Sequence, residues 1–269
     1  MRYSLCLVSR RHQIGVSWAF GVAAYLAVVS ATELSPLVAD EQTSPVVDNK
    51  QIDADLEKSL KDLKADSASI AYHSRRGDLL FFLRRYKEAV ASYRAMVKLD
   101  PAVDTSHWRL GIALFFAKEP AKAAAQFEKY HSFDDVDREN GIWRYLSQYK
   151  ATDKQTAKKE LIRYAKDDRE PFPAVYKLFD DSMTPAEALA AIPDDISATE
   201  RDKRLFYTEL YIGMHMVVKK REAEARKYLR LAVSRKWPQG NGFGPDYMWH
   251  VGRVQLADLS EAADAAESR

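Results

Sequence analysis

The chain has 269 residues, of which 30% are charged and only ten are glycine, a composition that suits a helical protein. Its formal net charge is +2, and three arginines and one glutamate within residues 1–39 account for that excess. The rest of the chain is neutral, so charge offers no case for a nucleic-acid partner. The single cysteine, Cys6, excludes an intramolecular disulfide framework and a cysteine-based metal site.

Residues 1–39 have the features of an export signal. A basic start precedes residues 14–31, an uncharged and mostly apolar run that ends in small residues suited to signal peptidase. An uncleaved anchor is the alternative, because a run of this length just spans a bilayer, and residues 14–31 would then tether the protein to a membrane. Residues 40–51 are predicted to be a flexible linker. We therefore expect an exported protein, periplasmic or secreted, or one anchored by its N-terminal helix.

A pattern of small and aromatic residues occurs twice, at the same spacing, within residues 70–137. The matched positions are Gly77, Ala89 and Tyr93 in the first copy and Gly111, Ala123 and Phe127 in the second. This spacing is typical of tetratricopeptide repeats (TPRs), in which two antiparallel helices approach closely at the small residues. The aromatic residues are expected to fill the gap between one unit and the next. A single unit cannot bury its apolar face, so units must stack.

Residues 52–259 are therefore predicted to form an all-α TPR solenoid of antiparallel helix pairs, with a degenerate middle and a C-terminal capping helix. An irregular third pair is expected around Tyr145 and Ala157, and Thr184 is the predicted N-cap of a later, shortened helix. Residues 260–269 are predicted to be a disordered tail. The remaining helices are expected over residues 52–63, 68–83, 86–99, 105–117, 120–131, 173–181, 185–192, 199–219, 221–235 and 246–259.

No motif of the chain predicts catalysis. The acidic segment 135–141 differs from a calcium loop, because Asn140 and Leu146 stand where the EF-hand needs glycine and glutamate. We interpret it as an acidic turn that caps the next helix. The histidines lack the spacing of a zinc protease, and no nucleotide-binding or nucleophile motif is present. The glycine-rich segment 240–244 is predicted to be a loop, and we expect no cofactor and no metal.

Stacked first helices of such repeats line a concave groove, which is the usual peptide site. The register predicts an aromatic and apolar groove surface that would bind a protein or peptide partner. The alternative is that several of its side chains pack between units. The predicted groove residues are Asp78, Phe81, Trp108, Ile112, Phe115, Ile142, Leu146, Tyr149, Tyr207, Tyr211 and Met214.

The order of regular and irregular units over roughly residues 70–258 resembles NlpI-type bacterial TPR lipoproteins. The segments that carry the resemblance include Gly111–Phe116, Trp143–Leu146 and Asp153–Leu161. It implies an all-helical, often dimeric adaptor of the bacterial envelope that brings cell-wall hydrolases to a processing protease. The lipidated cysteine of that family is absent here, because Cys6 precedes the apolar run.

The leading hypothesis is thus a non-enzymatic interaction scaffold of the bacterial envelope. Two others stay open. One is a structural envelope protein held by an uncleaved N-terminal helix. The other is an enzyme, or the non-catalytic subunit of an enzyme complex, whose site would use the carboxylates between Asp135 and Glu139 beside His131.

Overall fold

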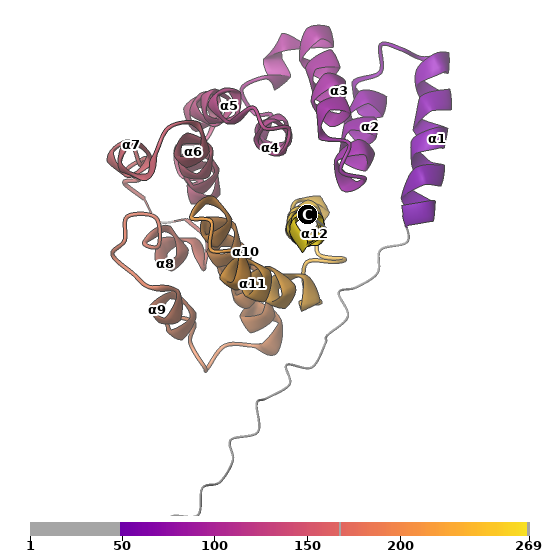
Figure 1. Ribbon diagram of the computed structural model, residues 1–269. Coiled ribbons are helices and arrows are strands. Elements are labelled where there is room, and N and C mark those ends of the chain that lie inside the picture. The colour runs from indigo at the N-terminus through magenta and orange to yellow at the C-terminus, as the bar shows by residue number, and fades with distance from the viewer. Residues whose placement is uncertain (1–48, 167, 268–269) are drawn as a thin grey trace, which may run out of the picture. The chain divides into compact units, whose positions relative to one another are not determined.

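The described residues, 49–166 and 168–267, form helices and no strand in the computed structural model, which confirms the predicted all-α class (Figure 1). The predicted signal or anchor and most of the predicted linker lie outside these residues. The described helices are α1 (Asn49–Ala65), α2 (Ile70–Phe82), α3 (Tyr86–Leu99), the 3₁₀ helix η1 (Pro101–Val103), α4 (Trp108–Phe116), α5 (Pro120–Phe133), α6 (Arg138–Ala151), α7 (Lys154–Lys159), α8 (Phe172–Tyr176), α9 (Pro185–Ala190), α10 (Ala198–Val218), α11 (Glu222–Ser234) and α12 (Phe243–Glu267).

The same turn joins the two helices of three pairs, α2/α3, α4/α5 and α10/α11. At the end of α4 the backbone N–H of Glu119 donates to the Leu114 carbonyl at 2.9 Å, and that of Lys118 donates to the Phe115 carbonyl at 3.3 Å. These two bonds define a Schellman motif, which reverses the chain through one left-handed residue. The left-handed residues are Arg84, Lys118 and Lys220, with φ of 63°, 63° and 58°.

Close approach within each pair depends on a glycine of the first helix. A Cβ at Gly111 would lie 2.6 Å from Cζ of Phe127, and one at Gly77 would lie 2.3 Å from Cε1 of Tyr93. Each ring therefore fills the hollow above the glycine of its own unit, a contact that the sequence did not predict. Phe127 also reaches the next unit, as predicted, because it stacks on Trp143 with ring centroids 6.0 Å apart.

The third pair is irregular because α7 is too short to cover α6. A Cβ at Gly141 would meet the hydroxyl oxygens of Tyr176 and Tyr164 at 2.6 and 2.7 Å. Both tyrosines lie beyond α7 and take the place of its missing turns. The later short helix α9 begins as predicted, since Thr184 caps it and Glu187 completes a capping box.

The N-terminal helix α1 packs on α2, and Arg75 of α2 pairs with Asp55 at 3.3 Å. In the sequence Ile52, Leu56 and Leu60 recur at helical spacing, which predicts one apolar face for this helix. Ile52 and Leu56 are buried, whereas Leu60 is exposed.

The C-terminal helix α12 lies amid the helix pairs, as Figure 1 shows end-on. Ring stacking holds it against α2, because Tyr247 stacks on Phe81 with centroids 5.1 Å apart and His250 stacks on Phe82 at 3.8 Å. On another side, the indole N–H of Trp249 donates to a carbonyl of α11 at 2.9 Å. Helix α12 therefore contacts both the pair α2/α3 and the pair α10/α11.

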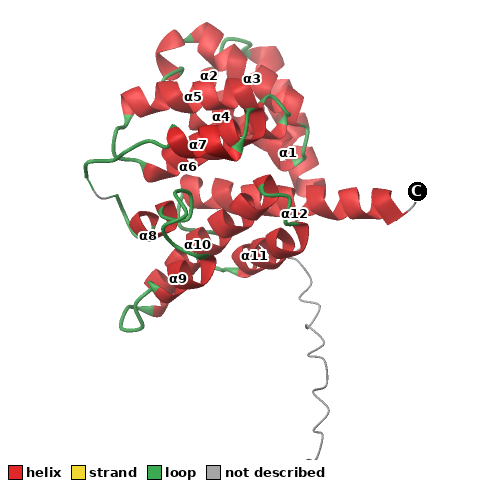
Figure 2. Ribbon diagram, turned by 60° about the vertical axis from the view of Figure 1, so that its left-hand side comes forward, coloured by secondary structure: helices red, strands yellow, loops and turns green. Residues whose placement is uncertain are grey.

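Polar contacts also hold the later turns of α12 against the end of α2 and the turn that follows it. Arg253 donates to the Phe82 carbonyl at 2.6 Å, and Arg84 donates to Asp258 at 2.7 Å and to Glu261 at 2.6 Å. The helix continues well past the predicted end at residue 259, and Figure 2 shows its last turns extending beyond the helix pairs. Residues 260–267 are rich in alanine and glutamate and contain no helix breaker, which favours this continuation.

Candidate functional site

The eleven residues predicted for the groove are mostly covered. Nine of them are buried, and Trp108 and Tyr149 are half-buried. Phe81 lies beneath Tyr247 of α12, whereas Phe115 packs edge-on against Trp143 with centroids 5.5 Å apart. Their role in binding stays a prediction. Of the eleven, Trp108 and Tyr207 line the cavity described below.

Asp78, also among those eleven, is held by an internal ion pair. The guanidinium of Arg109 donates to both of its oxygens at 2.7 and 2.8 Å, and the hydroxyl of Tyr93 donates to Oδ1 at 2.7 Å. Burial raises the pKa of Asp78, and the charge of Arg109 opposes that change. The carboxylate therefore ties α2, α3 and α4 together.

A cavity of about 520 Å³ opens beside the N-terminus of α6, between α4, α5, α10 and the start of α12. This volume is typical of ligand sites. Its aromatic lining consists of Trp108, Phe127, Tyr130, Trp143, Tyr207 and Trp237. Its titratable acidic and basic residues are Asp134, Asp137, Glu139, Asp168, Arg169 and Lys203.

Local capping places the first of these carboxylates. The Oδ1 atom of Asp134 accepts the backbone N–H groups of Val136 and Asp137 at 2.9 and 3.1 Å. Asp137 is the N-cap of α6, and its Oδ1 accepts the N–H of Glu139 at 3.0 Å. The predicted interpretation of this segment as a capping turn is confirmed.

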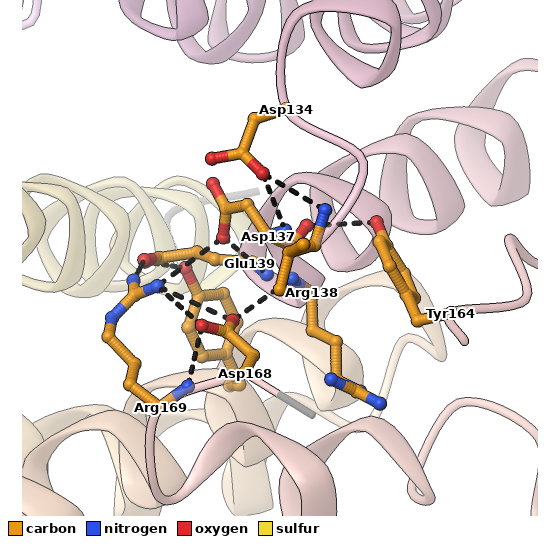
Figure 3. Close-up of polar contacts among 9 residues, drawn as sticks. Asp134, Asp137, Arg138, Glu139, Tyr164, Asp168 and Arg169 are labelled. Carbon is orange, nitrogen blue, oxygen red and sulfur yellow. Dashed lines mark hydrogen bonds and ion pairs between the residues drawn. The ribbon is translucent and has the colours of Figure 1, made fainter. Parts of the chain in front are cut away.

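Arg169 gathers three carboxylates from two segments of the chain (Figure 3). It donates to Oε2 of Glu139 at 2.5 Å and lies 3.3 Å from Asp168 and 3.5 Å from Asp137. The hydroxyl of Tyr211 donates to the second oxygen of Glu139. Both oxygens of Glu139 therefore have donors, although the cluster as a whole is acidic.

Burial sets the protonation of these groups. It raises the pKa of Glu139 from 4.5 to about 7, against the opposing charge of Arg169. Burial also raises the pKa of Asp137. The cost of removing a carboxylate from water is the cause in both cases.

One buried polar atom of the lining lacks a hydrogen-bond partner among the described residues. Asn140 is only 2% exposed, and its carboxamide oxygen has no donor there. Its nitrogen lies by the Tyr164 hydroxyl, as the indole N–H of Trp143 lies by that of Tyr211. Buried polar groups are normally paired, so the cavity offers an acceptor that a ligand could satisfy.

The sequence singled out the segment from Asp135 to Glu139 but not Asp168, Arg169 or Trp237. These three belong to loops that carry no recognisable motif, and the run of charged residues from Lys166 to Glu170 before Pro171 was the available signal.

Within residues 49–166 and 168–267, no group of three or more histidine, cysteine, aspartate or glutamate side chains is placed to hold a metal ion. None of the described helices combines the length and apolar character needed to cross a membrane. No family model matches the chain.

Proposed function

We propose that the chain is a non-enzymatic TPR scaffold of the NlpI type that recognises a partner protein at the cavity beside α6. The main support for this proposal is the cavity itself. It is preformed, lined by aromatic side chains, and open next to the start of α12, whereas most of the predicted groove residues are buried. Aromatic residues in a concave surface are common anchors of protein interfaces.

Repetition of one unit supports the TPR assignment. The interval from Arg84 to Lys118 equals that from Gly77 to Gly111, and both turns have the same left-handed conformation. The pair α10/α11 repeats the turn at Lys220. A chance helical hairpin would not reproduce the turn and the glycine contact together.

The surroundings of Glu139 favour binding over catalysis. A general acid or base must reach the proton that it transfers to or from a substrate. Here Tyr211 and Arg169 donate to the two oxygens of Glu139, so the carboxylate is engaged within the protein.

In this proposal the scaffold acts in the bacterial envelope, in line with the basic start and the apolar run at residues 14–31. Fusion of residues 1–50 to a reporter that is active only outside the cytoplasm tests this location. Reporter activity is expected, and an inactive fusion retained in the cytoplasm would contradict the export hypothesis.

Partner recognition is tested by filling the cavity without disturbing the fold. Gly244 lines the cavity, and an added Cβ there would meet nothing within 4 Å. Gly244→Trp should occupy the cavity, whereas Gly244→Ala adds one methyl group and serves as the matched control. The full chain and both variants are used for affinity capture from extracts of the cells that produce it.

We expect proteins captured by the wild type and by Gly244→Ala to be lost with Gly244→Trp. A thermal melt confirms that the tryptophan variant is folded. Capture that persists when the cavity is filled would place partner recognition elsewhere on the molecule and overturn the proposal.

A further inference from the structure

The cavity beside α6 contains more negative charge than its own cations balance. Four carboxyl groups line it, together with two basic side chains. Arg169 is shared among three of those carboxyl groups. Lys203 is already paired with Glu200, which is outside the lining, at 3.1 Å. The lining therefore retains a surplus of negative charge that a cation would offset.

One hydrogen-bond acceptor in the same lining is unused. The carboxamide oxygen of Asn140, on a residue that is 2% exposed, accepts no hydrogen bond from the described residues. A buried acceptor without a donor costs free energy until a donor arrives. A ligand that carries several N–H donors would satisfy this oxygen and the carboxylates together.

The aromatic side chains of the lining favour a planar cation. Half-buried Trp108 and Trp237 line the same cavity as these carboxylates. Aromatic faces attract cations, and the planar guanidinium also stacks on them. The chain's own Arg169 already combines both contacts, because it binds Glu139 at 2.5 Å and lies 4.4 Å from the ring centre of Phe172.

We propose that the cavity takes the guanidinium group of an arginine side chain presented by the partner protein. This inference rests on the proposed function and names the chemistry of its recognition. An anionic ligand would meet the carboxylates as like charges, and a neutral one would leave their surplus charge unbalanced. Lysine fits less well, since its ammonium group is a compact point charge without a planar face.

The probe is a blocked alanine peptide with one central arginine, titrated into the full chain by calorimetry. The matched peptide contains citrulline, which has nearly the same shape and no charge. We expect the citrulline peptide to bind at least about tenfold more weakly, because hydrogen bonds to charged groups contribute more than neutral ones. A lysine peptide is expected to bind several-fold more weakly than the arginine peptide.

Variants of the carboxylates test the site from the protein side. Asp134→Asn and Asp137→Asn keep an acceptor oxygen for their backbone caps and remove only the charge. Each should weaken binding of the arginine peptide by at least about tenfold. Asp100→Asn is the control, because Asp100 ends α3 as Asp134 ends α5, accepts the N–H of Ala102 at 3.0 Å, and does not line the cavity.

Equal affinities for the arginine and citrulline peptides, or no binding of the arginine peptide to the folded wild type, would overturn the inference. Binding of a neutral N-acetylglucosamine oligomer in place of the peptides would also overturn it. If Gly244→Trp abolishes partner capture while the arginine peptide does not bind, the proposed function stands and only the guanidinium assignment fails. If the peptide binds but capture is insensitive to Gly244→Trp, the proposed function fails instead.

Discussion

Glycines of this protein differ in what surrounds them, and the difference predicts the effect of a single methyl group. At Gly111 an added Cβ would lie 2.6 Å from the Phe127 ring, whereas at Gly244 it would meet nothing within 4 Å. Overpacking typically costs about 1–3 kcal/mol, which offsets or exceeds the gain of about 1 kcal/mol in helix propensity. At the residue scale, the contact rather than the residue type decides the outcome.

We expect Gly111→Ala to lower the free energy of unfolding by about 1–2 kcal/mol, as measured by urea denaturation. Gly244→Ala should leave it unchanged or raise it by up to about 1 kcal/mol, because Gly244 lies in α12 and the added methyl group meets nothing. Equal effects of the two substitutions would show that the Phe127 ring moves aside without cost.

The pKa of Glu139 predicts a pH dependence of stability. The carboxyl group of Glu139 keeps its proton up to about pH 7 in the folded protein, whereas it loses that proton near pH 4.5 in the unfolded chain. Its contribution to the free energy of unfolding is therefore present at low pH and is lost as the pH rises from about 4.5 to about 7. Glu139→Gln removes the titration. Urea denaturation between about pH 5 and about pH 8 should therefore show a steeper loss for the wild type than for the variant.

Buried histidines act in the opposite direction, since burial lowers the pKa of His107 to about 4 and that of His215 to about 3. Their stability contribution falls as the pH drops below about 6.5, in the wild type and in Glu139→Gln alike. The difference between the two proteins isolates Glu139. Identical pH profiles would mean that pairing with Arg169 keeps its pKa near the ordinary value.

At the scale of the element, each repeated turn places a non-glycine residue in the left-handed conformation. This conformation costs a side-chain-bearing residue about 1–2 kcal/mol, and glycine avoids that cost. Lys118 is exposed at such a turn, with φ of 63°. The turn therefore stores strain that packing of the adjoining helices offsets.

Lys118→Gly is expected to raise the free energy of unfolding by about 0.5–1 kcal/mol, because relief of the strain exceeds the extra flexibility of the unfolded chain. Lys98→Gly is the control, since Lys98 is exposed within α3, and it should cost up to about 1 kcal/mol. Thermal melts of both variants measure the difference. A destabilised Lys118→Gly would contradict the strain argument.

At the scale of the whole molecule, the fully buried ring of Tyr247 is a central contact between α12 and the first helices. Tyr247 stacks on Phe81 and meets Trp108 edge-on with centroids 5.0 Å apart. Its hydroxyl lies 3.3 Å from that of Tyr93. The ring therefore ties the C-terminal helix to α2, α3 and α4.

Tyr247→Ala should lower the free energy of unfolding by about 3–5 kcal/mol, because it leaves a cavity in the core. Tyr247→Phe keeps the ring and should cost about 1 kcal/mol. Urea denaturation distinguishes the two variants. A small effect of the alanine variant would mean that α12 rests on the helix pairs without stabilising them.

The sequence by itself determined the features that depend on neighbouring residues. The repeated spacing of glycine, alanine and aromatic residues predicted the first two helix pairs, and the helices expected over residues 199–219 and 221–235 form the last. Thr184 and the acidic segment before α6 were recognised as caps. Helix formation, capping and close approach within a hairpin are local, so their signals lie within a few turns of each other.

Only the tertiary structure decided where α12 packs and which charges meet in the cavity. Arg253 bonds Phe82 across 171 residues, and Arg169 meets Glu139 across 30. The sequence predicted a terminal helix but not its packing against the first helices. It also predicted an open groove in the place that this helix occupies. Burial and pairing over such separations depend on how every intervening element stacks, and no spacing within the chain encodes that result directly.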